Sequence, residues 1–149
     1  MTAPRLAEVG LLVGGLGSCA MAAYHFFLPY AWDWDRSLHV LPLALQWGSH
    51  SINFFMSYLM FAGGVLTLAA LLQMRAGRRP DRGIVAAMAI FWMINAAYQV
   101  IIPIPLPPYL GALRLVLLSY AIVVAGAHIV AFCVLGARSP LDAGRDAHA

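Results

Sequence analysis

Three histidines in the first third of the chain, His25, His39 and His50, are its best-placed residues for binding a metal or a haem. Imidazole is the commonest transition-metal ligand in proteins, and two histidines on facing helices can hold a b-type haem. No H-x-x-x-H, H-E-x-x-H or C-x-x-C-H motif accompanies them. We therefore predict no resident cofactor, and keep a transition-metal or haem b site at these histidines as an alternative.

A second set of polar side chains recurs inside otherwise apolar segments. The set comprises His25, His50, Asn53, Asn95, Tyr98, Gln99 and Arg114. With a helical rise of about 1.5 Å per residue, they fall at similar depths near one end of a helix bundle. Polar groups in lipid need partners or a cavity. This layer therefore predicts either a ligand pocket near the outer face or a network of hydrogen bonds between helices.

Four long apolar segments carry these residues, at about 6–30, 47–73, 84–102 and 113–137. A helix needs about 20 apolar residues to cross a bilayer. Of the 149 residues, 62% are hydrophobic and only 10% are charged, whereas soluble domains carry about 25% charged residues. The sequence predicts an all-α membrane protein, with one four-transmembrane-helix antiparallel bundle over 1–137 and a disordered cytoplasmic tail at 138–149.

The first segment also carries small residues at every fourth position, namely Gly10, Gly14, Ser18 and Ala22. Residues four apart share one face of a helix, and small side chains there allow another helix to approach closely. This stripe predicts a packing surface, either for the chain's own helices or for those of a partner.

The basic residues are distributed unevenly along the chain. All nine of them, histidine apart, are arginines, and four fall in the connection at 74–83. Arg5 precedes the first segment, and only Arg36 and Arg114 belong to the opposite side. The positive-inside rule then predicts that both termini and the 74–83 connection are cytoplasmic. An all-arginine basic set suits a GC-rich bacterial genome, so the expected membrane is a bacterial inner (plasma) membrane. The net charge of +3 is thus interpreted as an indicator of membrane topology, and no nucleic-acid partner is expected.

Two connections carry further expectations. The 74–83 connection is short, which predicts that the second and third helices are antiparallel neighbours. The 102–109 connection is rich in proline, which cannot continue a helix. Its apolar residues are expected to rest on the mouth of the bundle.

These features favour some function classes over others. The middle of each apolar segment contains no Asp, Glu or Lys, which argues against the carboxylate relay of a proton-coupled antiporter. Our leading hypothesis is a small polytopic inner-membrane protein without a catalytic centre. It would be an accessory or assembly subunit, or bind a lipid-like ligand through the polar layer. The alternatives are a histidine-based metal or b-haem redox protein and a small-molecule facilitator. Expected partners are the bilayer, a second copy or a larger membrane complex.

Overall fold

The computed structural model describes residues 2–106 and 108–137, and their regular structure is helical. The long helices are α1 (Ala3–Ala31), α3 (Leu43–Arg75), α4 (Arg82–Ile101) and α5 (Gly111–Ala137), and the short ones are α2 (Trp34–Ser37) and η1 (Pro108–Leu110). Four helices are long and apolar enough to cross a membrane. The prediction of an all-α chain with four such helices is confirmed. The predicted tail at 138–149 lies outside the described residues.

Prolines and one aspartate set several of the helix ends. Helix α3 begins at Leu43, before the predicted start at 47. Pro42 occupies the N-cap, and proline is tolerated at a helix start because the N–H that it lacks would have no hydrogen-bond partner there. Asp81 caps α4 by accepting a hydrogen bond from the Gly83 backbone N–H at 2.7 Å. Pro103 follows the end of α4 and prevents its continuation.

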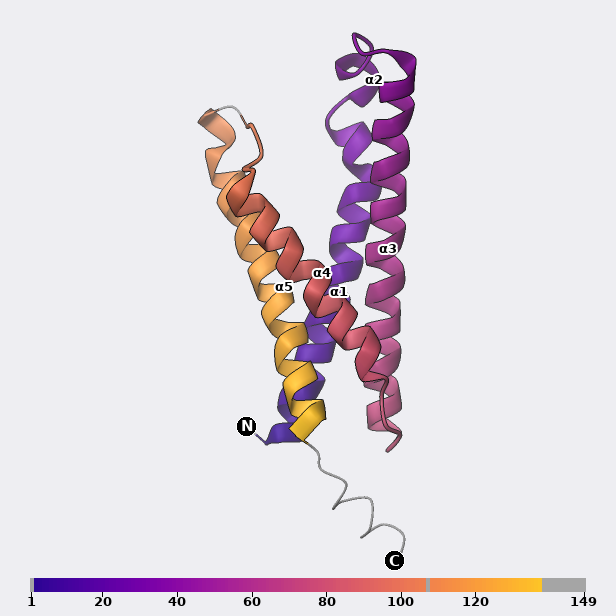
Figure 1. The fold of residues 1–149 in the computed structure, drawn as a ribbon, viewed down its shortest axis with the longest axis vertical. Coiled ribbons are helices and arrows are strands. Elements are labelled where there is room, and N and C mark those ends of the chain that lie inside the picture. The colour runs from indigo at the N-terminus through magenta and orange to yellow at the C-terminus, as the bar shows by residue number, and fades with distance from the viewer. Residues whose placement is uncertain (1, 107, 138–149) are drawn as a thin grey trace, which may run out of the picture.

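The long helices form two pairs. Helix α1 packs along α3, α4 packs along α5, and α1 also contacts α5, whereas α3 and α4 make few contacts. Figure 1 shows the two pairs crossing in their lower parts and diverging towards the end that carries α2. The connection between α3 and α4 therefore joins their ends without making them closely packed neighbours, contrary to expectation. A short loop fixes only the helix ends it joins, and α4 instead packs on α5.

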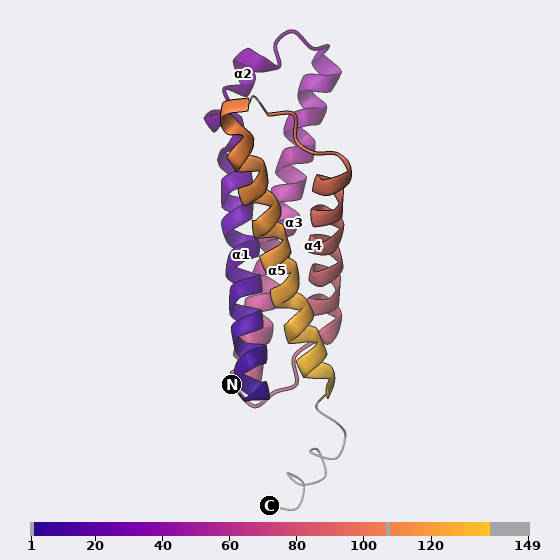
Figure 2. The same ribbon diagram turned by 90° about the vertical axis from the view of Figure 1, so that its left-hand side faces the viewer.

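Figures 1 and 2 show which parts of the chain meet at each end of the molecule. The start of α1, the end of α5 and the connection between α3 and α4 lie at one end. Helix α2 and the connection between α4 and α5 lie at the other.

The small-residue stripe of α1 packs against the chain's own helices. Its members Gly10, Gly14, Ser18 and Ala22 are all buried. A Cβ added at Gly10 would lie 2.7 Å from the Ala127 carbonyl oxygen, and one at Gly14 would lie 2.7 Å from the His128 ring. Both contacts are with α5, so the stripe is used within the chain.

Two buried clusters fill the lower and middle parts of the molecule. The lower cluster includes Leu11, Leu71 and Leu135, and the middle one centres on Trp92 of α4. Trp92 is 1% exposed and donates a hydrogen bond through Nε1 to Ser18 Oγ at 2.9 Å. This bond ties α4 to α1.

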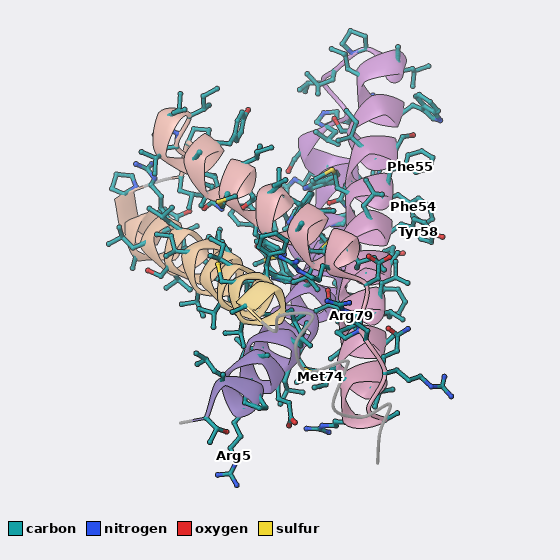
Figure 3. The ribbon with its side chains drawn as sticks, turned by 60° about the horizontal axis from the view of Figure 1, so that its bottom comes forward. Arg5, Phe54, Phe55, Tyr58, Met74 and Arg79 are labelled. Carbon is teal, nitrogen blue, oxygen red and sulfur yellow. The ribbon has the colours of Figure 1, made fainter. Side chains whose placement is uncertain are left out.

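The outer surface of the long helices is strongly apolar. In Figure 3, Phe54, Phe55 and Tyr58 project outward from α3, and each is more than half exposed. Charged groups instead gather near the end that comes forward in this view, where Arg5 and Arg79 are labelled.

Candidate functional site

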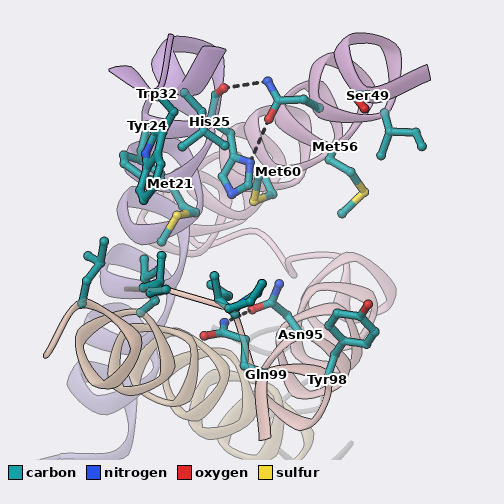
Figure 4. A pocket seen from close by; sticks show the side chains of 18 of the residues that line it. Met21, Tyr24, His25, Trp32, Ser49, Met56, Met60, Asn95, Tyr98 and Gln99 are labelled. Atoms are coloured by element: carbon teal, nitrogen blue, oxygen red, sulfur yellow. Dashed lines mark hydrogen bonds between the residues drawn. The ribbon is translucent and has the colours of Figure 1, made fainter. Parts of the chain in front are cut away.

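A cavity of about 690 Å³ lies between the two helix pairs in the part of the molecule where they diverge. All four long helices contribute to its lining, together with the segments that follow α1 and α4. Figure 4 shows the cavity with residues of α1 and α3 on one side and residues of α4 on the other. Helices α3 and α4 contribute lining residues on opposite sides of the cavity and make few contacts with each other.

The cavity brings together most of the predicted polar layer. The lining includes His25, Asn53, Asn95, Tyr98 and Gln99, whereas His39, His50 and Arg114 are not among the lining residues. The depths calculated along each predicted helix thus placed these residues at the end of the bundle that holds the cavity. They did not distinguish side chains that face the cavity from those that do not.

On the α1 and α3 side, His25 and Asn53 are bonded to each other twice. His25 Nδ1 donates to Asn53 Oδ1 at 3.1 Å, and Asn53 Nδ2 donates to the His25 carbonyl oxygen at 2.8 Å, as the dashed lines in Figure 4 show. Ser57 Oγ donates to the Asn53 carbonyl oxygen at 2.6 Å. With Nδ1 carrying the proton, His25 Nε2 presents a lone pair, and within the described residues no hydrogen-bond partner occupies it.

On the α4 side, Asn95 and Gln99 form a second polar pair. Gln99 Nε2 donates to Asn95 Oδ1 at 2.7 Å. Gln99 Oε1 is buried without a hydrogen-bond partner in the described part of the chain. Each amide can make more hydrogen bonds than this one, so the pair retains capacity to bind a polar group. Tyr98 lies about one turn after Asn95 and directly before Gln99 on α4, and it is more than half exposed.

The remaining predicted residues make local contacts. His50 packs edge-on against the Trp34 ring, with centroids 5.4 Å apart, and His39 Nδ1 donates to the Arg36 carbonyl oxygen. Arg114 Nη2 donates to the Ile104 carbonyl oxygen at 2.8 Å, which holds the segment after α4 in place.

The predicted three-histidine metal set is therefore not gathered at the cavity, where only His25 is found. Among residues 2–106 and 108–137, no group of three or more His, Cys, Asp or Glu side chains is placed to hold a metal ion.

The sequence pattern did not predict some of the lining residues, in particular three methionines. Met21, Met56 and Met60 line the cavity. Their spacing indicates shared helix faces, because Met21 and His25 are four residues apart on α1 and Met56 and Met60 are four apart on α3.

The apolar residues of the proline-rich connection were expected to rest on the bundle, and the stretch at 104–106 does line the cavity.

His128 lies outside the cavity and is fully buried. Its Nδ1 donates to the Val124 carbonyl oxygen at 2.9 Å, and its Nε2 lies 3.3 Å from Thr67 Oγ1. Both ring nitrogens thus have partners within the bundle, and the ring also packs against Gly14. These contacts indicate a structural role in joining α5 to α1 and α3.

The residues of the lining determine which interactions the cavity offers. Within the described chain the lining residues include no Asp, Glu, Lys or Arg, and most of them are apolar or aromatic. A concave apolar surface with a few convergent polar groups is typical of a site for a small amphipathic molecule.

Comparison with known proteins gives no further guide to this site. No protein-family model matches the chain, and neither a curated protein nor a solved structure does so.

Proposed function

We propose that this chain is a multi-pass inner-membrane protein that binds a lipid-like amphipathic molecule in the cavity between its two helix pairs. The observation that carries the proposal is the cavity itself. It measures about 690 Å³, all four long helices contribute to it, and an apolar lining surrounds a few polar groups.

The surface of the chain supports insertion as an antiparallel four-helix bundle. Exposed aromatic and aliphatic side chains cover all four long helices, as lipid contact requires. Arginines cluster near one end, which under the positive-inside rule favours cytoplasmic termini and a cytoplasmic connection between α3 and α4. The cavity then lies in the outer half of the bilayer.

The shape of the cavity favours a ligand that comes from the membrane. Helices α3 and α4 make few contacts with each other, and we propose that a molecule dissolved in lipid enters the cavity between them. An apolar tail there would contact side chains such as Ile52 and Leu117. Burial of each CH₂ group of such a tail contributes about 0.8 kcal/mol.

The α4 side of the cavity suits the polar end of the ligand. Asn95 and Gln99 present amide groups with unused hydrogen-bonding capacity, and Tyr98 adds a phenolic hydroxyl. The paired amides are uncharged, so they favour a hydroxyl, carbonyl or amide headgroup over an ionised one.

Binding fits this geometry better than passage through the protein. The two buried clusters occupy the lower and middle parts of the molecule, so the cavity has a floor at Trp92. This favours a binding role over that of a facilitator. A protein that holds a lipid-like molecule without catalytic groups of its own suits an accessory or assembly subunit of a membrane complex.

A cavity-filling variant tests the proposal. Ser49 lines the cavity on α3, and we expect Ser49→Trp to occupy part of its volume. Ser119→Trp is the matched control, because Ser119 is exposed on α5 and is not a lining residue. Each protein would be purified in mild detergent and its bound lipids identified by mass spectrometry.

We expect a defined amphipathic species to co-purify with the wild type and with Ser119→Trp, and to be lost from Ser49→Trp. An identical lipid profile in all three proteins, with all three folded, would contradict the proposal.

A further inference from the structure

We propose that the α1 and α3 wall of the cavity is a site for a soft monovalent metal ion, Cu(I), formed by His25 with Met21, Met56 and Met60. Thioether sulfur is a soft ligand that selects Cu(I) among biological metals, and imidazole nitrogen binds the same ion. In Figure 4 these four side chains lie on the same side of the cavity. All four line it.

Contacts between α1 and α3 hold the four residues at a common level. His25 is bonded to Asn53, and Cys19 Sγ donates to the Phe61 carbonyl oxygen at 3.9 Å. Met21 lies between residues 19 and 25 of α1, and the other two methionines lie between residues 53 and 61 of α3. The three sulfurs and the imidazole therefore belong to a stretch of little more than one helical turn on each helix.

The imidazole is oriented as a metal-binding histidine usually is. Such a histidine donates its second ring N–H to a fixed acceptor, which sets the tautomer and turns the other nitrogen towards the metal. Here Asn53 Oδ1 is that acceptor, and Asn53 is itself held by its bond to the His25 carbonyl oxygen. The Nε2 lone pair is then available for a metal.

The charges around the cavity favour a monovalent ion. The lining residues include no Asp, Glu or Cys within the described chain, so the ligands would be neutral. The cost of transferring an ion into a medium of low dielectric constant rises with the square of its charge, and neutral soft ligands offset it best for Cu(I). Methionine also fills gaps in apolar cores, but these three line the same cavity as an imidazole nitrogen that has no hydrogen-bond partner within the described residues.

This proposal does not depend on the lipid-like ligand. The metal would use residues of α1 and α3, whereas the polar end of the lipid would contact Asn95 and Gln99 of α4.

The full-length chain in detergent is suited to a direct binding experiment. Cys19 and Cys133 are free thiols and would bind Cu(I) themselves, so both are replaced by alanine in a background variant. Cu(I) would be kept reduced by ascorbate and titrated against a chromophoric Cu(I) chelator. We expect the background variant to bind about one Cu(I) per chain, with sulfur and nitrogen neighbours in its X-ray absorption spectrum.

Methionine substitutions then locate the ion. Met21→Leu, Met56→Leu and Met60→Leu conserve volume, so each variant should fold. We expect each to weaken Cu(I) binding by about tenfold or more, the range seen when a metal site loses a supporting group. Met93→Leu is the matched control, because Met93 is exposed on α4 and does not line the cavity.

Two results would overturn the proposal. One is the absence of stoichiometric Cu(I) in the folded background variant. The other is equal affinity in the cavity variants and in Met93→Leu. Neither result bears on the co-purified lipid of Ser49→Trp and Ser119→Trp, so the two proposals fail separately.

Discussion

The hydrogen bond between Trp92 and Ser18 shows how single polar groups hold the floor of the cavity. Trp92 Nε1 donates to Ser18 Oγ at 2.9 Å, and Ser18 Oγ donates to the Gly14 carbonyl oxygen at 2.8 Å. Both side chains are buried, so neither group has water as an alternative partner. The indole therefore fixes α4 against α1 immediately below the cavity.

At this scale we predict that Ser18→Ala destabilises the protein. The substitution leaves the Trp92 N–H buried without its acceptor, which costs about 1–3 kcal/mol. Adding Trp92→Phe removes the unpaired donor, so the double variant should lose less than the sum of the two single losses. Unfolding in mixed detergent micelles measures these free energies.

Ser119→Ala provides the control for this cycle, because Ser119 is exposed on the surface of α5. Its free energy of unfolding should stay within about 0.5 kcal/mol of the wild type. Strict additivity of Ser18→Ala and Trp92→Phe would show that the bond contributes nothing to stability.

At the scale of the elements, α1 is the helix on which α3 and α5 both pack. It contacts α5 through Gly10 and Gly14, and a Cβ added at Gly15 would lie 3.1 Å from the Gly64 carbonyl oxygen of α3. Two faces of α1 thus admit close approach by two different helices. Helices α3 and α5 both pack on α1, whereas α4 packs mainly on α5 and makes few contacts with α3.

We predict that Gly10→Ala separates α1 from α5. Its Cβ would lie 2.7 Å from the Ala127 carbonyl oxygen, a backbone atom that cannot move aside as a side chain can. Overpacking of this kind costs about 1–3 kcal/mol. We expect a lower melting temperature in detergent and weaker proximity between labels on the two helices.

Gly126→Ala is the matched control on α5, since no atom lies within 4 Å of the added Cβ. It should leave the melting temperature unchanged or raise it, because alanine is the better helix former. Equal destabilisation by the two substitutions would argue against tight packing at Gly10.

At the scale of the whole molecule, the proposed topology makes the two ends of the bundle chemically accessible from opposite sides. The connection at 76–81 carries Arg78 and Arg79, and the segment between α2 and α3 carries Val40, which is 73% exposed. Under the positive-inside rule the first is cytoplasmic and the second faces outward.

We predict that, in intact cells, a membrane-impermeant maleimide labels Val40→Cys and not Arg79→Cys, both in the background that lacks Cys19 and Cys133. Permeabilised cells should label both variants, which controls for intrinsic reactivity. The reverse pattern in intact cells would contradict the proposed orientation and would place the cavity in the inner half of the bilayer.

The amino-acid sequence alone determined the helical, apolar character of the chain and the end of the bundle at which polar residues gather. These properties are local, because a helix of about 20 apolar residues is defined by its own composition and length. Depth follows in the same way, since each residue adds about 1.5 Å along its helix. His25, Asn53, Asn95 and Gln99, which this arithmetic places at similar depths, all line the cavity.

Only the tertiary structure decided which of these side chains meet. The rotation of each helix about its axis depends on contacts far apart in the sequence, such as those of Gly10 with Ala127 and Trp92 with Ser18. In the folded chain His25 lines the cavity, whereas His50 packs against Trp34. Divergence of the two helix pairs opens the cavity, and it depends on packing summed over every helix rather than on any one segment.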